Sequence, residues 1–230
     1  MRDLLYIGIL PMLLTLGAYQ IGLLIQKKRK SALANPILIA MILVLLFMLL
    51  TGLDNSTYQA GMTKMSWLMT PATVCLAIPM YQHFQTLRRN LPAVLAGITA
   101  GTVSCLLMVV LWAMVFRIDT TLALSLLPKS VTSAIGVPLS EMVGGLGSVT
   151  TAAIILTGIL ANILGTFFCK IFRLTDPIAQ GVAFGTSGHV IGTARANEIS
   201  ELTGAVSSFS LVVAGLLTAI IFPLAATSCQ

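Results

Sequence analysis

Long apolar stretches separated by short polar segments run along most of the chain. They lie at about residues 4–26, 36–53, 67–83, 93–116, 146–170 and 205–226, and most of them reach or approach the roughly 20 residues that a helix needs to cross a bilayer core. This pattern predicts an all-α integral membrane protein with about six transmembrane helices.

Two further stretches, residues 121–143 and 178–203, have a different composition. They are apolar enough to enter a membrane, but they contain Pro, Gly, Ser, Thr and ionisable residues at a density that a spanning helix does not show. Irregular backbone is tolerated at membrane depth only where protein buries it or water reaches it. The sequence therefore predicts two broken or re-entrant segments in addition to the six helices.

The basic residues favour a re-entrant path for both stretches. If each stretch enters and leaves by the same side, most Lys and Arg residues share one side, which the positive-inside rule assigns to the cytoplasm. This group contains Lys27, Lys28, Arg29, Lys30, Arg88, Arg89, Lys170 and Arg173, against Arg2, Lys64 and Arg117 on the other side. Complete crossing stays an alternative, because it would move only Lys170 and Arg173 and weaken the bias.

Composition limits the classes of function. The 230 residues are 57% hydrophobic and only 9% charged, and the mean hydropathy is +0.99, so charge is too scarce for a water-facing surface. A soluble enzyme, a DNA-binding domain and a secreted disulfide scaffold are excluded. The net charge of +6 falls in short clusters between spans, so we expect a lipid bilayer and no nucleic acid as partner.

Motifs for catalysis or metal binding are missing. The four cysteines show no CxxC spacing and no Cys/His cluster has metal-ligand spacing, so we interpret the cysteines as small packing residues. Ser187 near His189 is the one nucleophile beside a base, and it has no third residue to orient it. We expect no enzyme activity, no metal and no cofactor.

The two broken stretches resemble each other at an offset of sixty residues. Ser140-Glu141-x-x-Gly144 recurs as Ser200-Glu201-x-x-Gly204, and Lys129 falls opposite His189. A unit of one broken stretch plus one crossing must invert when repeated, and such symmetry is typical of the binding site of a secondary transporter. Chance similarity between small-residue helices is the alternative. We predict N-terminal helices for scaffolding or dimerisation at 1–116 and a core at 117–230 of two inverted units, 121–170 and 178–226.

The first stretch places a lysine between two prolines. Pro128 and Pro138 lack an amide hydrogen and are expected to break the helix, and Lys129 would cost about 2.5 to 3.5 kcal/mol near the bilayer centre. Its functional interpretation is a counter-charge for an anion, with hydroxyl groups from Ser130, Thr132 and Ser133. The alternative is a lysine whose side chain reaches back to the interface.

The second stretch combines glycines with a histidine and an arginine. We expect Gly185 and Gly188 to break the helix, and Gly192 and Thr193 to lie close to a ligand. Arg195 can hold a carboxylate through two parallel hydrogen bonds, whereas an ion pair with Glu198 is the alternative. His189 is either a proton carrier or a neutral hydrogen-bonding residue.

Two weaker signals accompany these stretches. Glu141 and Glu201 are expected at the membrane surface, although they could instead neutralise Lys129 and Arg195. Pro71 and Pro79 are eight residues apart in the short third span, so that helix is expected to be bent or interrupted.

Several of these motifs together resemble the LrgB/CidB family, which includes bacterial inner-membrane proteins and a plastid glycolate/glycerate transporter. The resemblance rests on Asn35-Pro36, the Pro71 to Tyr81 pattern, Leu127-Pro128-Lys129-Ser130-Val131-Thr132, His189 with Gly192-Thr193-Ala194-Arg195, and Gly204-Ala205. The chain departs from the family at Ala134 and Gly136, where Pro and Ala are usual, and at Thr186-Ser187-Gly188-His189, where Thr-Ala-Ser-His is usual.

The resemblance implies a multi-pass protein of the bacterial inner membrane. One implied function is transport of small monocarboxylates such as pyruvate, glycolate or glycerate by a homodimer or higher homo-oligomer. Lys129 and Arg195 would then hold the carboxylate, Ser130, Thr132, Ser133 and Thr193 its other oxygen, and His189 would relay a coupled proton. The other implied function is antiholin-like control of murein hydrolases and autolysis with a holin-like LrgA/CidA membrane partner.

Overall fold

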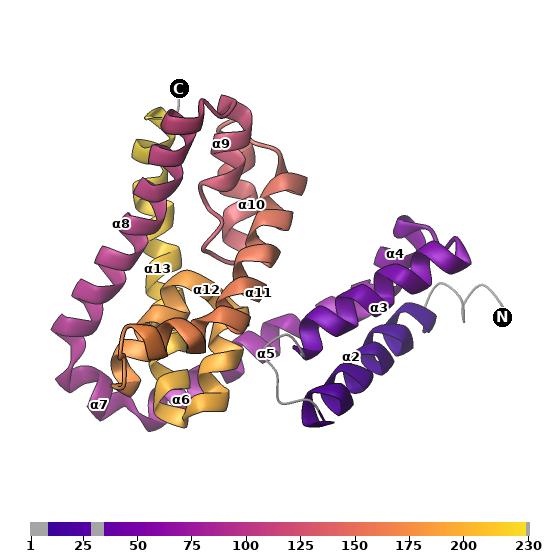
Figure 1. Ribbon diagram of the computed structural model, residues 1–230, viewed down its shortest axis with the longest axis horizontal. Coiled ribbons are helices and arrows are strands. Elements are labelled where there is room, and N and C mark those ends of the chain that lie inside the picture. The colour runs from indigo at the N-terminus through magenta and orange to yellow at the C-terminus, as the bar shows by residue number, and fades with distance from the viewer. Residues whose placement is uncertain (1–8, 29–34, 229–230) are drawn as a thin grey trace. The chain divides into compact units, whose positions relative to one another are not determined.

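The computed structural model describes residues 9–28 and 35–228, and every regular element in these ranges is a helix (Figure 1). The chain forms two compact units, residues 1–75 and 76–230. The division falls before the predicted boundary at residue 116, so the long helix that ends there belongs to the same unit as the two broken segments. The predicted span at 4–26 begins outside the described residues.

The first unit contains α2 (Leu10–Lys28), α3 (Pro36–Thr51), α4 (Asn55–Ser66) and α5 (Met69–Cys75). Helix α3 begins where the Asn35 side chain accepts a 2.8 Å hydrogen bond from the Ile37 amide, and it ends at Gly52, which adopts φ 65°. This pairing of an Asn cap, a first-turn Pro and a left-handed Gly is the usual chemistry of helix ends. Ala18, Ala40 and Val44 form the small core between α2 and α3.

The second unit begins with two short helices, α6 (Ala77–Gln82) and α7 (Phe84–Arg89). Together with α5 they cover the predicted third span, which is interrupted as expected. Pro71 and Pro79 lie in the first turns of α5 and α6, where a missing amide hydrogen costs least. The prolines therefore lie at the beginnings of helices here.

The remaining helices of the second unit are α8 (Leu91–Phe116), α9 (Thr120–Leu126), α10 (Ser133–Met142), α11 (Gly147–Ile171), α12 (Pro177–Ile199) and α13 (Glu201–Thr227). Helix α12 packs against α8, α11 and α13. Within this unit, α11 and α13 run in opposite directions (Figure 1).

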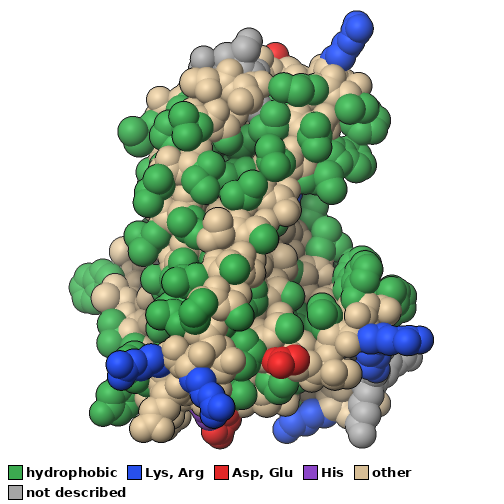
Figure 2. Space-filling model, turned by 90° about the vertical axis from the view of Figure 1, so that its left-hand side faces the viewer, with side chains coloured by type: hydrophobic (Ala, Val, Ile, Leu, Met, Phe, Trp, Pro, Cys, Tyr) green, Lys and Arg blue, Asp and Glu red, His purple; other side chains and the backbone are tan. Residues whose placement is uncertain are grey.

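Three described helices, α8, α11 and α13, are long and apolar enough to cross a membrane, and the 16-residue α3 is apolar but shorter. They match the predicted spans at 93–116, 146–170, 205–226 and 36–53. Figure 2 shows one face on which hydrophobic side chains cover the middle and charged side chains gather toward the two ends. On α8 the exposed side chains include Leu111, Trp112 and Val115. This distribution is that of an integral membrane protein.

Candidate functional site

The first predicted broken segment is a helical hairpin made of α9 and α10 with an irregular tip, residues 127–132. Pro128 has no amide hydrogen to give to the Leu124 carbonyl. That carbonyl instead accepts a hydrogen bond from the Ser140 hydroxyl at 3.4 Å, and the Leu146 amide donates to the Ser125 hydroxyl at 2.7 Å. These bonds join α10 and the start of α11 back to α9, which closes the hairpin.

The second predicted broken segment is also a hairpin, formed by the two halves of α12 on either side of His189. His189 has φ 42° and ψ −136°, which is not helical. A Cβ atom added to Gly192 would lie only 2.6 Å from the Phe184 carbonyl oxygen, although eight residues of straight helix would separate these groups by about 12 Å. The chain therefore folds back at Gly188–His189.

The two hairpin tips contain Lys129 and His189, which lie sixty residues apart in the sequence. Near one end of α13, Leu124 and Leu127 pack against Phe222 and Ala226. Near the other end, the start of α13 packs so closely on α12 that a Cβ atom on Gly181 would lie 2.7 Å from the Thr203 carbonyl oxygen. The hairpins thus approach each other from opposite ends of one helix.

The details of the helix breaks differ from the sequence prediction. Pro138 lies inside α10 and does not end it. Gly185 lies within the first half of α12, and the residue that leaves the helical conformation is His189. Glycine is used at Gly185 and Gly188 for close packing, against Ser207 and Ala161 respectively. The prediction was correct at Pro128, whose missing amide interrupts the first stretch.

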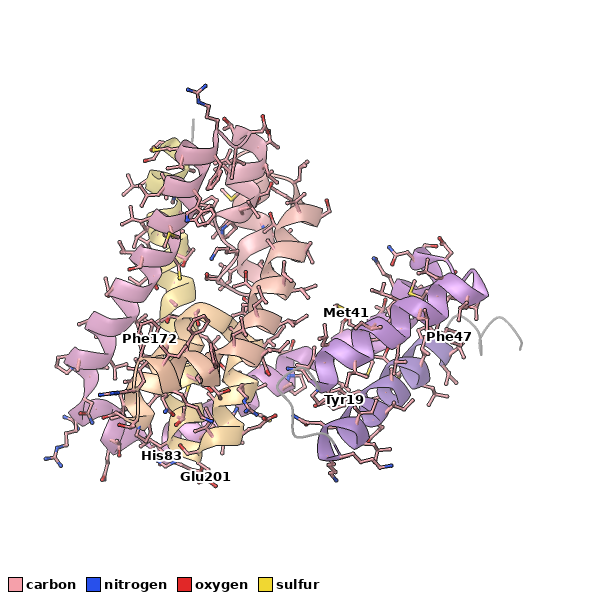
Figure 3. All side chains as sticks on the ribbon, in the orientation of Figure 1. Tyr19, Met41, Phe47, His83, Phe172 and Glu201 are labelled. Carbon is pink, nitrogen blue, oxygen red and sulfur yellow. The ribbon has the colours of Figure 1, made fainter. Side chains whose placement is uncertain are left out.

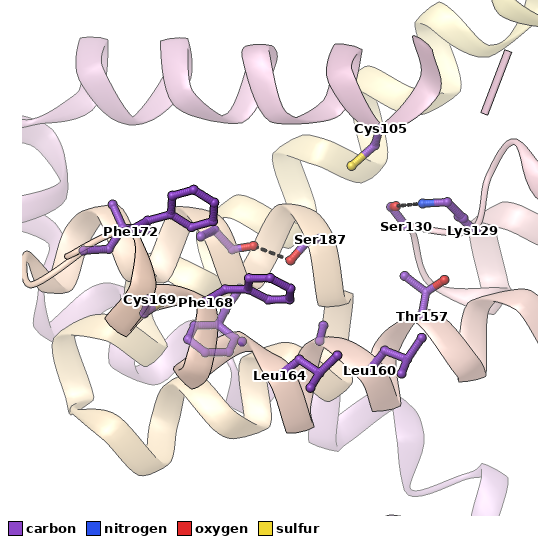
Figure 4. A pocket seen from close by; sticks show the side chains of 15 residues that line it. Cys105, Lys129, Ser130, Thr157, Leu160, Leu164, Phe168, Cys169, Phe172 and Ser187 are labelled. Carbon is purple, nitrogen blue, oxygen red and sulfur yellow. Dashed lines mark hydrogen bonds between the residues drawn. The ribbon is translucent and has the colours of Figure 1, made fainter. Parts of the chain in front are cut away.

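A cavity of about 500 Å³ lies where the two hairpins meet α11 and α8 (Figure 4). Its polar end is formed by Lys129, Ser130 and Thr157, and Ser187 of the second hairpin lies between this end and the aromatic rings of Phe168 and Phe172. Cys105 contributes from α8. The cavity is therefore amphipathic, with one end suited to a charged group and the other to a hydrocarbon group.

Among the residues that the structure describes, Lys129 is the one charged residue that lines this cavity. Its ammonium nitrogen is 3.5 Å from the Ser130 hydroxyl oxygen, at the limit of a hydrogen bond, and the described residues offer it no carboxylate partner. An ammonium group has three donors, and a charge-assisted hydrogen bond is about twice as strong as a neutral one. The cavity can accordingly bind a small anion at Lys129.

The structure brings only part of the predicted site to this cavity. Lys129 and Ser130 line it, whereas Thr132, Ser133, His189, Gly192, Thr193 and Arg195 do not. Thr157 and Ser187 line it but were not among the predicted binding residues. Ser187 was noted in the sequence only as a potential nucleophile, and Thr157 lies in a span that gave no polar signal.

Arg195 forms an ion pair with Glu198 one helical turn away. The sequence had left this ion pair open as the alternative to carboxylate binding. The Arg195 side chain is about one third exposed. Glu141 and Glu201, the candidates for neutralising Lys129 and Arg195, are both exposed. Figure 3 shows Glu201 with His83 at the end of the second unit where α7 lies.

His189 and Thr193 hold the second hairpin together. The His189 side chain is only 4% exposed, and its Nε2 atom donates a 2.9 Å hydrogen bond to the Ile154 carbonyl of α11. The Thr193 hydroxyl donates to the His189 carbonyl at 2.8 Å, so it accepts from the Ser207 hydroxyl of α13, also at 2.8 Å. These bonds satisfy the backbone at the break and join α12 to its neighbours.

We expect Thr193→Val to lower the free energy of unfolding by about 1 to 3 kcal/mol, because it leaves the His189 carbonyl and the Ser207 hydroxyl buried without this partner. The check is the thermal unfolding midpoint of the purified protein in detergent. The double variant Thr193→Val/Ser207→Ala lacks both hydroxyl groups. We expect it to lose less free energy of unfolding than the sum of the losses in the two single variants. Additive losses would show that the pair does not act as a unit.

The three long apolar helices, together with a cavity between two hairpins, define an all-helical membrane protein. The chain belongs to the LrgB-like family, whose family model matches residues 15–228. No solved structure matches the chain.

Proposed function

We propose that this protein transports small monocarboxylates of the pyruvate, glycolate or glycerate type across the membrane of a bacterial cell. The observation that supports this function best is Lys129, a cation without a carboxylate partner among the described residues, in a cavity lined by both hairpins. A lysine at membrane depth costs free energy. An anion bound in this cavity would offset part of that cost, and such binding gives a reason for a lysine at this position.

In the proposed binding mode the substrate carboxylate lies against Lys129 and Ser130. Thr157 is the neighbouring hydroxyl group for a keto or hydroxyl oxygen, and the apolar remainder of the cavity receives the hydrocarbon part of the substrate. His189 maintains the hairpin, because its Nε2 atom is already used by the Ile154 carbonyl. A coupled proton on His189 would therefore be carried by its Nδ1 atom, which this bond does not use.

The two hairpins provide a route for alternating access. We propose that the units 121–170 and 178–226 form an inverted repeat, that the chain has about six transmembrane helices in all, and that both hairpins are re-entrant. Supporting this, each hairpin is followed by a long apolar helix, and α11 and α13 run in opposite directions. Small movements of either tip would open the cavity to one side. A homodimer, with the helices before α8 as scaffold, completes the proposal.

The test is uptake of labelled pyruvate and glycolate into proteoliposomes that contain the purified protein, with and without a pH gradient. Saturable uptake would support a carrier. If folded, inserted protein carries no flux, the proposal fails, and antiholin-like regulation with a holin-like LrgA/CidA partner becomes the function to test by copurification and by autolysis of cells.

Arg195→Gln is expected to change pyruvate uptake by less than about threefold, because Arg195 lies outside the cavity and its exposed ion pair contributes only about 0.2 to 0.5 kcal/mol to helix stability. Uptake rates in proteoliposomes, normalised to inserted protein, provide the check. Glu198→Gln should behave alike, since it removes the other half of the pair. If Arg195→Gln lost as much pyruvate uptake as a variant of a cavity residue, Arg195 would have to be counted among the substrate-binding residues.

A further inference from the structure

A second, much smaller cavity, with a volume of about 10 Å³, lies between the first hairpin tip, α8, α12 and α13. Four hydroxyl-bearing side chains from four different segments line it: Thr102 of α8, Ser130 of the first tip, Thr186 of α12 and Thr218 of α13. This volume matches about one water-sized particle. The cavity therefore has room for a single water molecule or a single small ion.

Thr102 has a buried hydroxyl without a partner. Its side chain is 3% exposed, and its Oγ1 atom forms no hydrogen bond within the described structure. A buried polar group left unsatisfied costs about 1 to 3 kcal/mol, so this oxygen indicates a bound species. The Thr186 hydroxyl already donates its hydrogen to the Val182 carbonyl at 2.7 Å, which leaves the lone pairs of its oxygen for that species.

Two helix ends supply further negative character. Helix α9 ends at Leu126, and Leu127 and Pro128 line the cavity. The first half of α12 ends at His189, so Thr186 lies in its last turn. The carboxyl end of a helix carries partial negative charge, and the ends of broken membrane helices coordinate sodium in secondary transporters.

We propose that this cavity binds one sodium ion, and that the ion is coupled to the carboxylate at Lys129; the coupling rests on the proposed transport function. Oxygen atoms are the ligands that hard cations prefer. The described residues of the lining include no carboxylate, which disfavours a divalent ion in a buried site. The small volume favours sodium over the larger potassium ion.

Ser130 connects the two sites. It lines both cavities, and its hydroxyl lies 3.5 Å from the Lys129 ammonium nitrogen. An ammonium group so close opposes a cation by electrostatic repulsion, and a carboxylate bound to Lys129 removes that repulsion. Sodium and carboxylate should therefore bind with positive cooperativity, each raising the affinity of the other by the same factor, about 5- to 150-fold.

The test measures sodium binding directly, with radioactive ²²Na⁺ on the purified full-length protein and choline chloride to hold ionic strength constant. We expect saturable binding that pyruvate strengthens and that potassium displaces poorly. Thr102→Val preserves the shape of the side chain and should weaken sodium binding at least tenfold, and Thr218→Val provides an independent second variant.

Thr99→Val is the matched control, because Thr99 lies on the same helix, is exposed, and donates its hydroxyl to the Leu95 carbonyl. It should bind sodium like the original protein. Absence of saturable sodium binding in folded protein, or binding unchanged in both cavity variants, would overturn the proposal and leave a buried water only.

Pyruvate uptake separates the two proposals. Equal uptake in sodium and choline would overturn sodium coupling while transport stands. Sodium binding that depends on Thr102, in a protein that neither binds nor moves pyruvate, would confirm the cation site and contradict the proposed function.

Discussion

Lys129→Met is expected to reduce pyruvate uptake into proteoliposomes by roughly 10- to 150-fold. Hydrogen bonds to charged groups contribute about 1.5 to 3 kcal/mol each, and Lys129 is the one charged residue in the described lining of the large cavity. No other described cation in that lining can take over the carboxylate. Initial uptake rates across a range of pyruvate concentrations measure the effect.

The Lys129→Met variant should still fold. Methionine fits where the lysine stem lies, and the described structure shows no ion pair that the change would break. An uncharged side chain also removes the cost of placing a charge at membrane depth. We therefore expect an unchanged or raised thermal unfolding midpoint, so that loss of uptake cannot be attributed to loss of protein.

Lys170→Met provides the matched control for charge. Lys170 lies in the last turn of α11, is exposed and does not line the cavity. This variant should keep uptake within about twofold of the original, as an exposed charge contributes little. Equal uptake by the original protein and both lysine variants would remove Lys129 from the binding site and with it the main argument for a carboxylate carrier.

Gly185→Leu is expected to have the largest effect on stability, lowering the free energy of unfolding by about 3 kcal/mol or more. Any side chain at Gly185 would meet the Ser207 carbonyl oxygen and then the Ser210 Cβ atom, which is 2.7 Å from the position of an added Cβ. The first contact is backbone, which cannot rotate away. Overpacking a core usually costs about 1 to 3 kcal/mol, and a backbone contact places this change at the upper end.

Helix propensity favours leucine over glycine and so opposes the destabilising effect of the clash. The control is therefore a glycine where the same replacement causes no clash. Replacing a helical Gly by Leu gains about 0.8 to 1 kcal/mol, which is smaller than the expected clash. Gly17 of α2 has nothing within 4 Å of an added Cβ atom, so Gly17→Leu should leave stability unchanged or raise it. Unfolding midpoints in detergent measure both variants. A Gly185→Leu protein as stable as the original would contradict the close contact of α12 and α13.

The same close contact connects stability to function. Small residues allow membrane helices to approach closely, and here Gly181 and Gly185 hold the first half of α12 against α13. That half ends at the second hairpin tip, beside Ser187 in the large cavity and Thr186 in the small one. A substitution that separates α12 from α13 would therefore also displace the lining of both cavities.

Much of the fold could be predicted from the sequence. The spans at 93–116, 146–170 and 205–226 agree closely with α8, α11 and α13, since their length and hydropathy are local properties. The interruption of the first broken stretch at Pro128 was also local, because a proline lacks the amide hydrogen that a helix requires. The hydrogen bond through Ser140 that closes this hairpin could not be predicted locally, because it joins residues that are sixteen positions apart.

The residues of the candidate site could be predicted only in part, because some of them give a local signal in the sequence and others do not. Lys129 stood out because a cation between prolines in an apolar stretch is costly. Thr157 gave no signal, as one hydroxyl in a spanning helix is ordinary. Arg195 was predicted as a carboxylate ligand or as the partner of Glu198, and the two remained equal until the structure placed the pair outside the cavity.

By itself the sequence determined an all-helical membrane protein, two interrupted segments and a lysine in one of them. Hydropathy, proline chemistry and the cost of a buried charge act along the chain and need no knowledge of distant residues. Only the tertiary structure decided that His189 holds a backbone break, that Arg195 pairs with Glu198, and that four hydroxyl groups surround one small cavity. Those outcomes depend on which helices approach closely, because contacts between distant residues arise only when the packed helices bring them together.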